Sequence, residues 1–203
     1  MAYPTVAGPY GFQPINLIGG QVFAGATRQI PITSASATSI YYGDVVRLNT
    51  SGTLSRVSTT DSATDAVGIF LGCAFTNPTT KQFLQQQYYP ASTVASDIVA
   101  YVCDDPDTYF KVAVLSNSTT IGGMTQTDIG NNVAILATAG STTTGDSKEG
   151  VSATTGSATT LPFRVIAGVP ETVNASGSFT EVIVKFNFGV HTYYSASAVA
   201  TAA

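Results

Sequence analysis

The sequence predicts an all-β fold, either a β-sandwich or a small β-barrel, with an extended N-terminal arm and at most one or two short helical turns. From residue 40 onward, apolar and polar residues alternate in short runs, and period two is the repeat of a β-strand. β-Branched residues are frequent in these runs, and glycine, asparagine and aspartate turn signals separate them. We therefore expect three parts: an arm over residues 1–32, a β-rich core domain over 33–190 and a tail over 191–203.

The arm is expected to be extended, because its prolines and glycines recur too often for a continuous helix. It also carries more large apolar side chains than a disordered segment would. We predict that these side chains dock on a neighbouring subunit, and packing along their own domain is the alternative. The residues assigned to this contact are Tyr3, Tyr10, Phe12, Ile15, Leu17, Ile18 and Phe23.

The first part of the core is predicted to be a hairpin followed by a buried strand. Residues 42–48 and 53–58 flank a turn in which Gly52 can take a positive φ without strain. The run 66–75 is apolar without alternation, so we expect a strand buried on both faces. Gly68 and Gly72 in this run suit a close backbone approach or a bulge.

The second half contains three local signals. The Asp-Asp-Pro-Asp sequence at 104–107 is predicted to be a turn, capped by its aspartates, that joins two strands as a hairpin. Thr125 and Asp128 have the spacing of a helix N-cap and its acid, which predicts one helical turn. Residues 140–160 are almost all small and polar, so they are predicted to form a flexible excursion.

Residues 181–191 form the clearest amphipathic strand of the chain. Alternate residues of a strand point to opposite faces. The face predicted to point inward consists of Val182, Val184, Phe186, Phe188 and Val190. The polar face consists of Glu181, Lys185, Asn187 and His191.

We predict no catalytic, metal or cofactor site, and we expect that the chain is not an enzyme. His191 is the single histidine and lies near the end of the last strand, which is a poor place for a nucleophile's base. The sequence has no phosphate loop, dinucleotide fingerprint or G-x-S-x-G elbow. The aspartates at 104–107 are not followed by the further oxygen donors of a calcium loop. Cys73 and Cys103 are expected to be buried and reduced, although pairing is left open.

Charge is scarce in this chain. Charged residues make up 10% of it, compared with about 25% in ordinary globular domains. The surface must therefore be covered by hydroxyls, amides and backbone, or by other protein. The net charge is −4 and the eight Lys and Arg residues are scattered singly, whereas a nucleic-acid groove needs clustered cations. We therefore expect no direct nucleic-acid partner. The sequence shows neither a signal-peptide pattern nor a run of about 18 apolar residues, so we also expect no membrane partner and synthesis in a cytoplasm.

The order of elements in residues 42–72 resembles that of a known family. The segment reads YGDVVRLNTSGTLSRVSTTDSATDAVGIFLG: a Gly-Asp-hydrophobic strand, a glycine turn, a second strand and then Ala-Val-Gly-Ile-Phe-Leu-Gly. This succession resembles the β-domain signature of tailed-bacteriophage capsid decoration, or cement, proteins. Residues 2–32 are similar to the start of structural proteins of marine and cyanobacterial phages. The resemblance covers about half of the chain.

The resemblance implies a homotrimer on the capsid exterior of a virion. It would sit over the three-fold and quasi-three-fold junctions of the head, with the major capsid protein as its partner, and stabilise the shell. A tail, baseplate or head-fibre component of the same virion is an alternative with the same composition. A sugar-binding β-sandwich module is another, because the tyrosine pairs at 41–42, 88–89 and 193–194 could stack on sugars, although the chain has no tryptophan.

Overall fold

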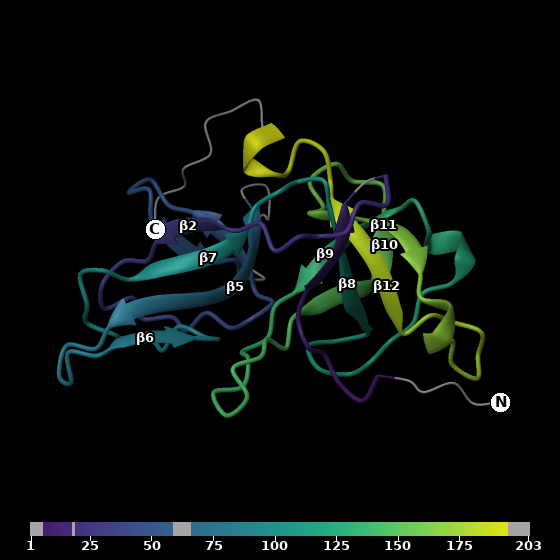
Figure 1. Cartoon of the computed structure of the whole chain (residues 1–203). Helices are drawn as coiled ribbons and strands as arrows, with labels where there is room; N and C mark the ends of the chain where they lie inside the picture. The colour runs from purple at the N-terminus through teal and green to yellow at the C-terminus, as the bar shows by residue number, and fades with distance from the viewer. Residues whose placement is uncertain (1–5, 18, 59–65, 195–203) are drawn as a thin grey trace.

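The computed structural model describes residues 6–17, 19–58 and 66–194, which form two β lobes that lie side by side (Figure 1). We call them the barrel and the second sheet. The strands of the barrel are β8 (Thr108–Leu115), β10 (Gly150–Gly156), β9 (Asn132–Leu136), β11 (Phe163–Gly168) and β12 (Glu181–Phe186), with β1 (Gln13–Leu17) attached to β8. The strands of the second sheet are β2 (Arg28–Pro31), β7 (Val99–Cys103), β5 (Ala66–Thr76), β3 (Val45–Leu48) and β4 (Leu54–Arg56), with β6 (Phe83–Gln86) paired to β5.

The barrel closes because β8, near one end of the strand order β1-β8-β10-β9-β11-β12, also pairs with β12 at the other end. One side of β8 pairs antiparallel with β12, and its other side pairs first with β1 and then, in parallel, with β10. The chain enters the barrel at β1, leaves it to build the second sheet and returns at β8. The N-terminal segment and the C-terminal half therefore belong to one lobe.

The second sheet also curls toward closure. Ile32, just after β2, forms a parallel bridge with Leu54 at the start of β4. The Thr33 hydroxyl donates to the Thr53 hydroxyl at 2.9 Å beside this bridge. These contacts bring the two outer strands of the sheet together, which reduces the length of open edge.

The all-β prediction is confirmed. In the described part of the chain, the helical segments are three 3₁₀ turns of three residues each, namely η1 (Gln126–Asp128), η2 (Pro170–Thr172) and η3 (Thr192–Tyr194). The predicted N-cap holds: the backbone N–H of Thr125 donates to Asp128 Oδ2 at 2.7 Å. This hydrogen bond, from the N-cap backbone to the acid three residues later, fixes the start of η1.

The predicted hairpin and the buried strand after it are confirmed. β3 and β4 pair across a turn in which Gly52 has a φ of +73°. β5 is buried along nearly its whole length. A Cβ on Gly68 would lie 2.3 Å from the Cys103 carbonyl oxygen, and the register of β5 on β7 shifts between Phe70 and Gly72. These two glycines therefore provide the close approach and the bulge.

The buried apolar side chains form two clusters: one fills the barrel and extends to Val45, Ile69 and Cys103 of the second sheet, and the other lies within the second sheet. The barrel core centres on four phenylalanines in stacked or edge-to-face contact: Phe12, Phe110, Phe163 and Phe186. The core of the second sheet is built largely on Phe70, Tyr89 and branched aliphatic side chains. Residues 33–190, expected to form the core domain, contribute to both lobes, together with strands that lie within the predicted arm.

The prediction of a second hairpin at 104–107 is wrong. β7 belongs to the second sheet and β8 to the barrel, so this turn carries the chain from one lobe to the other. Asp105 does cap the turn, since its Oδ1 accepts the Asp107 N–H at 2.8 Å. The local signal identified a turn, but strand pairing depends on residues far away in the sequence.

The prediction of a flexible excursion over 140–160 is wrong over residues 150–156, because these form β10, a strand of the closed barrel, whereas residues 140–149 form a loop. Threonine and valine favour strands, and backbone pairing on both sides does not require large side chains. Gly150 permits the tight fit, since a Cβ there would lie 2.6 Å from Leu115 Cδ1.

The inward face predicted for residues 182–190 is correct except at Phe188. Val182, Val184, Phe186 and Val190 are buried, whereas the Phe188 side chain is 75% exposed. β12 ends at Phe186, and Gly189 in the following turn has a φ of +85°. The alternation of a strand stops where the strand stops, so Phe188 turns outward.

Candidate interaction surface

Several titratable side chains of the described residues make contacts within the chain. No group of three or more His, Cys, Asp or Glu side chains in the described ranges is arranged to hold a metal ion. His191 is fully buried, its Nδ1 accepts the Tyr193 N–H at 3.2 Å, and burial lowers its pKa. Asp107 Oδ1 lies 2.9 Å from Lys185 Nζ.

The scarce cations are largely directed at partners within the chain. Arg28 pairs with Asp104 at 3.0 Å, and Lys111 with Glu181 at 3.5 Å. Arg164 donates to two amide oxygens, those of Asn132 and Asn187. Hydroxyl, amide and apolar groups therefore dominate the outer surface, and depletion of charge is a feature of interface cores.

The predicted arm residues are divided between the interior and the surface of the barrel. Phe12 is fully buried, and its ring stacks on Phe163 with centroids 4.6 Å apart. Phe12 therefore packs within its own chain, which was the alternative, and its side chain is not available to contact another subunit. The burial of Phe12 depends on the pairing of β1 with β8. This pairing joins segments far apart in the sequence, so the local pattern around Phe12 could not predict it.

Tyr10 is held against the outside of the barrel. Its hydroxyl donates to Glu181 Oε1, and Lys111 Nζ lies 5.6 Å from the centre of its ring. Burial and the neighbouring Glu181 carboxylate raise the pKa of Tyr10 well above its ordinary value. Tyr10 thus anchors the entry of the chain into β1.

The other arm residues are half-buried or lie outside the described ranges. Ile15 and Leu17 are half-buried in β1, and Phe23 packs partly against the barrel core. Tyr3 and Ile18 lie outside the described residues. The docking of these residues on another subunit stays a prediction.

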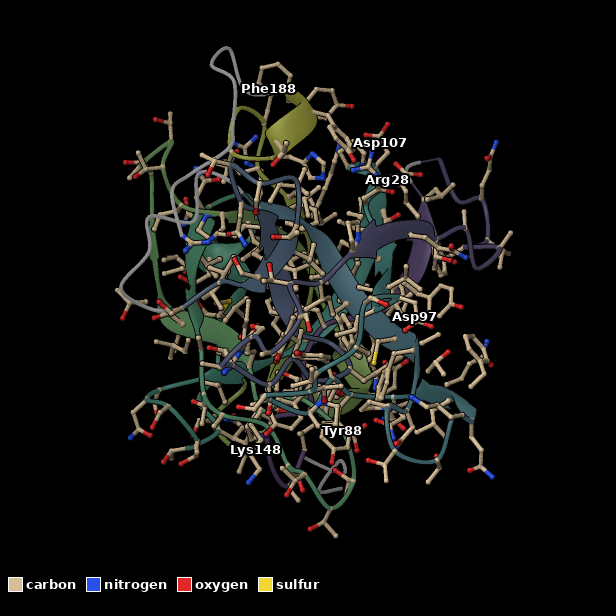
Figure 2. The ribbon with its side chains drawn as sticks, turned by 90° about the vertical axis from the view of Figure 1, so that its left-hand side faces the viewer. Arg28, Tyr88, Asp97, Asp107, Lys148 and Phe188 are labelled. Carbon is tan, nitrogen blue, oxygen red and sulfur yellow. The ribbon has the colours of Figure 1, made fainter. Side chains whose placement is uncertain are left out.

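A cluster of exposed aromatic rings lies at the end of β12, and we call it the aromatic surface. Its members are Phe188, Tyr193 and Tyr194, which are 75%, 45% and 39% exposed. The Phe188 and Tyr194 rings lie 5.3 Å apart. Figure 2 shows Phe188 beside η3, at the end of the molecule that also carries Arg28 and Asp107.

Tyr193 is fixed in place by the pair that Arg28 and Asp104 form. Its hydroxyl donates to Asp104 Oδ2 at 2.6 Å, and the Arg28 guanidinium lies 5.2 Å from the centre of its ring. The ring therefore keeps its orientation without a partner, and a fixed aromatic side chain loses little entropy when it binds. The sequence analysis missed this surface, because it placed Phe188 in the core.

A second exposed apolar site lies at the outer end of the second sheet. Phe83 on β6 and Val94 are 63% and 61% exposed. An open hollow of about 600 Å³ lies at this end, and Val94, Pro78 and Asp97 line part of it. Its rim includes Lys81, a non-glycine residue with a positive φ of 59°.

The tyrosine pairs differ in how much ring they present. Tyr41 is buried and stacks on Tyr88 at 5.6 Å, and Tyr89 is fully buried. Tyr88 lies at the end opposite Phe188 (Figure 2). The pair at 193–194 is thus the one in which both rings are exposed, so a sugar that stacks on paired tyrosines would have to use the aromatic surface.

No protein-family model, curated protein or solved structure matches the chain. No helix in the part of the chain that the structure describes is long and apolar enough to cross a membrane.

Proposed function

We propose that the chain is a structural protein of a phage virion that decorates the outside of the head and stabilises the shell. The proposal starts from the resemblance of residues 42–72 to capsid decoration proteins. This segment contains β3, β4 and most of β5, which pair in the order β5-β3-β4 and form one side of the second sheet. The resembling order of residues therefore corresponds to one contiguous structural unit.

The observation that carries the proposal is the kind of surface the chain presents. Several of the few cations pair with carboxylates of the same chain, while aromatic rings stand exposed. Such a surface suits a large, uncharged interface better than the chemistry of a soluble substrate. A protein that contacts a lattice at several points gains strength from effective concentration, so each contact can be weak.

The proposed assembly is a homotrimer over the three-fold and quasi-three-fold junctions of the head, with the major capsid protein as its partner. Each subunit would bury on the order of 800 Å² against its neighbours. Sedimentation velocity of the purified chain tests the trimer. A monomer at every concentration would contradict a preassembled trimer.

The decisive measurement for the proposed function is the copy number of the chain in virions that contain it. Quantitative mass spectrometry of purified particles should give a number close to that of the major capsid protein. A far smaller number would overturn the proposal in favour of a tail, baseplate or head-fibre component. A cryo-EM map of the same particles would show whether the density lies at the junctions.

A further inference from the structure

Three charged side chains meet inside the protein where the two lobes join. Asp44 and Glu149 are fully buried, and Arg56 lies between them. The Arg56 Nε is 3.1 Å from Asp44 Oδ2 and 3.0 Å from Glu149 Oε1, and a second guanidinium nitrogen lies 2.9 Å from the same Glu149 oxygen. One guanidinium therefore serves two carboxylates.

The cluster links the lobes through both side chains and backbone. Asp44 directly precedes β3 and Arg56 is the last residue of β4 in the second sheet, whereas Glu149 directly precedes β10 of the barrel. Glu149 Oε2 accepts the Val45 N–H at 2.9 Å, so the carboxylate of one lobe caps a strand of the other. Arg56 also donates to the Thr138 carbonyl. A change in the charge of this cluster acts directly on the junction.

The cluster has an excess of negative charge. Among the described residues, the charged groups that face the two carboxylates are Arg56 and each other. The remaining neighbours are the backbone N–H groups of Tyr41 and Val45 and the Ser147 hydroxyl, whose hydrogen bond lowers the pKa of Asp44. Lys148 in the same segment is exposed to solvent. Two carboxylates that share one cation in a buried site favour the uptake of a proton.

The arrangement of acceptors shows where a proton can be held. Both Glu149 oxygens accept hydrogen bonds, and so does Asp44 Oδ2, which takes the Tyr41 N–H at 2.8 Å. Asp44 Oδ1 is buried and has no hydrogen-bond partner among the described residues. Burial raises the pKa of Asp44 to about 6, against the effect of Arg56. Burial and, second, the Asp44 charge raise the pKa of Glu149 as well. The two carboxylates therefore titrate as one interacting pair, and the bound proton is shared between them.

We propose that Asp44, Arg56 and Glu149 form a proton-binding joint that holds the barrel and the second sheet together more tightly in mildly acidic than in neutral solution. The sign follows from linkage. The folded chain keeps a proton that the unfolded chain loses near pH 4, so stability falls as the pH rises from about 4 to about 6 and stays lower above that. This property belongs to the chain itself and does not depend on the proposed function.

The first test is chemical denaturation of the full chain at pH values between 4.5 and 8. A pKa that moves from 3.8 to about 6 changes the unfolding equilibrium constant by roughly 30-fold between pH 4.5 and pH 8. Asp44→Asn leaves one carboxylate for one guanidinium, so we expect it to remove most of this dependence while the chain stays folded. Asp97→Asn is the matched control, because Asp97 is exposed and its hydrogen bonds to the Thr76 N–H and hydroxyl lower its pKa. The same pH dependence in the Asp44 variant and in the original chain would overturn the proposal.

The second test needs no variant. In NMR spectra with labelled carboxyl carbons, the Asp44 signal should titrate near pH 6 and the Glu149 signal above the ordinary range of a glutamate, whereas the Asp97 signal should titrate below the ordinary range of an aspartate. Hydrogen exchange of the Val45 N–H, corrected for the intrinsic rate, should become faster as the pH rises through the same range. Two carboxyls that both titrate below pH 4.5, or a Val45 N–H with constant protection, would refute the joint.

Discussion

The ring of Phe12 stacks on the ring of Phe163, with centroids 4.6 Å apart and an angle of 18° between the planes. In the sequence the two residues are separated by the entire second sheet and by β1, β8, β9 and β10, yet both are fully buried in the barrel core. The N-terminal segment is thus a structural part of the lobe that the C-terminal half completes.

Replacing Phe12 with alanine should lower the free energy of unfolding by about 3 to 5 kcal/mol, the usual cost of emptying a filled aromatic core position. Denaturant titration of the purified chain measures the loss. Val22→Ala is the control on the same segment, because the Val22 side chain is 77% exposed and should matter little. Equal effects of the two substitutions would contradict the packing of Phe12.

Phe186 and Phe188 offer a comparison within one strand and its end. Phe186 is 3% exposed and contacts Phe110 and Phe163, so Phe186→Ala should cost about 3 to 5 kcal/mol. Phe188→Ala should change stability by less than about 1 kcal/mol, because an exposed ring loses little contact. The measurement is the same denaturant titration. A large cost at Phe188 would restore the inward face that simple alternation predicts.

These pairs show what the sequence could predict. Local patterns identified the β3–β4 hairpin, the buried strand β5 and the N-cap at Thr125, because each depends on residues within a few positions. Pairing between distant segments was not readable: β10 was mistaken for a loop, and the turn at 104–107 for a hairpin. The aromatic surface was missed for a related reason, since the pattern continued past Phe186 although the strand did not.

The two cysteines should stay reduced and unreactive in the folded protein. Cys103 pairs with Ile69 across β5 and β7, whereas Cys73 pairs with Ala100, so the thiols are about 10 Å apart along the sheet, too far for a disulfide. Burial raises the pKa of Cys73 to about 12 and that of Cys103 to about 11. We expect iodoacetamide at pH 8 to label neither thiol until denaturant is added. Mass spectrometry would reveal labelling of the native protein, which would contradict this burial.

Deletion of residues 2–20 should destabilise the barrel, because it removes Phe12 and β1 together. This differs from the expectation for a detachable arm, whose loss would leave the β-domain folded. Deletion of residues 2–9 should keep both Phe12 and the contact between Tyr10 and Glu181. Circular dichroism melts of the two truncated chains should therefore differ clearly, with the shorter deletion close to the full chain. If both melt like the full chain, the N-terminal segment contributes little to the barrel.

The aromatic surface provides the sharpest test of attachment to a shell. Phe188 and Tyr194 are exposed rings in contact with each other, and Tyr193 is held by Asp104 and Arg28, so a partner meets a preformed site. If the chain decorates heads through this surface, Phe188→Ser should weaken binding to undecorated heads by about tenfold or more, as expected for an aromatic hot spot. Phe83→Ser is the matched control, since it removes an exposed phenylalanine from the opposite lobe, on β6. Bound copies are counted after sedimentation of the heads at several concentrations of the chain, with stability checked for each variant. Full binding by the Phe188 variant and weakened binding by the Phe83 variant would move the contact to the outer end of the second sheet, where Val94 lies over its open hollow.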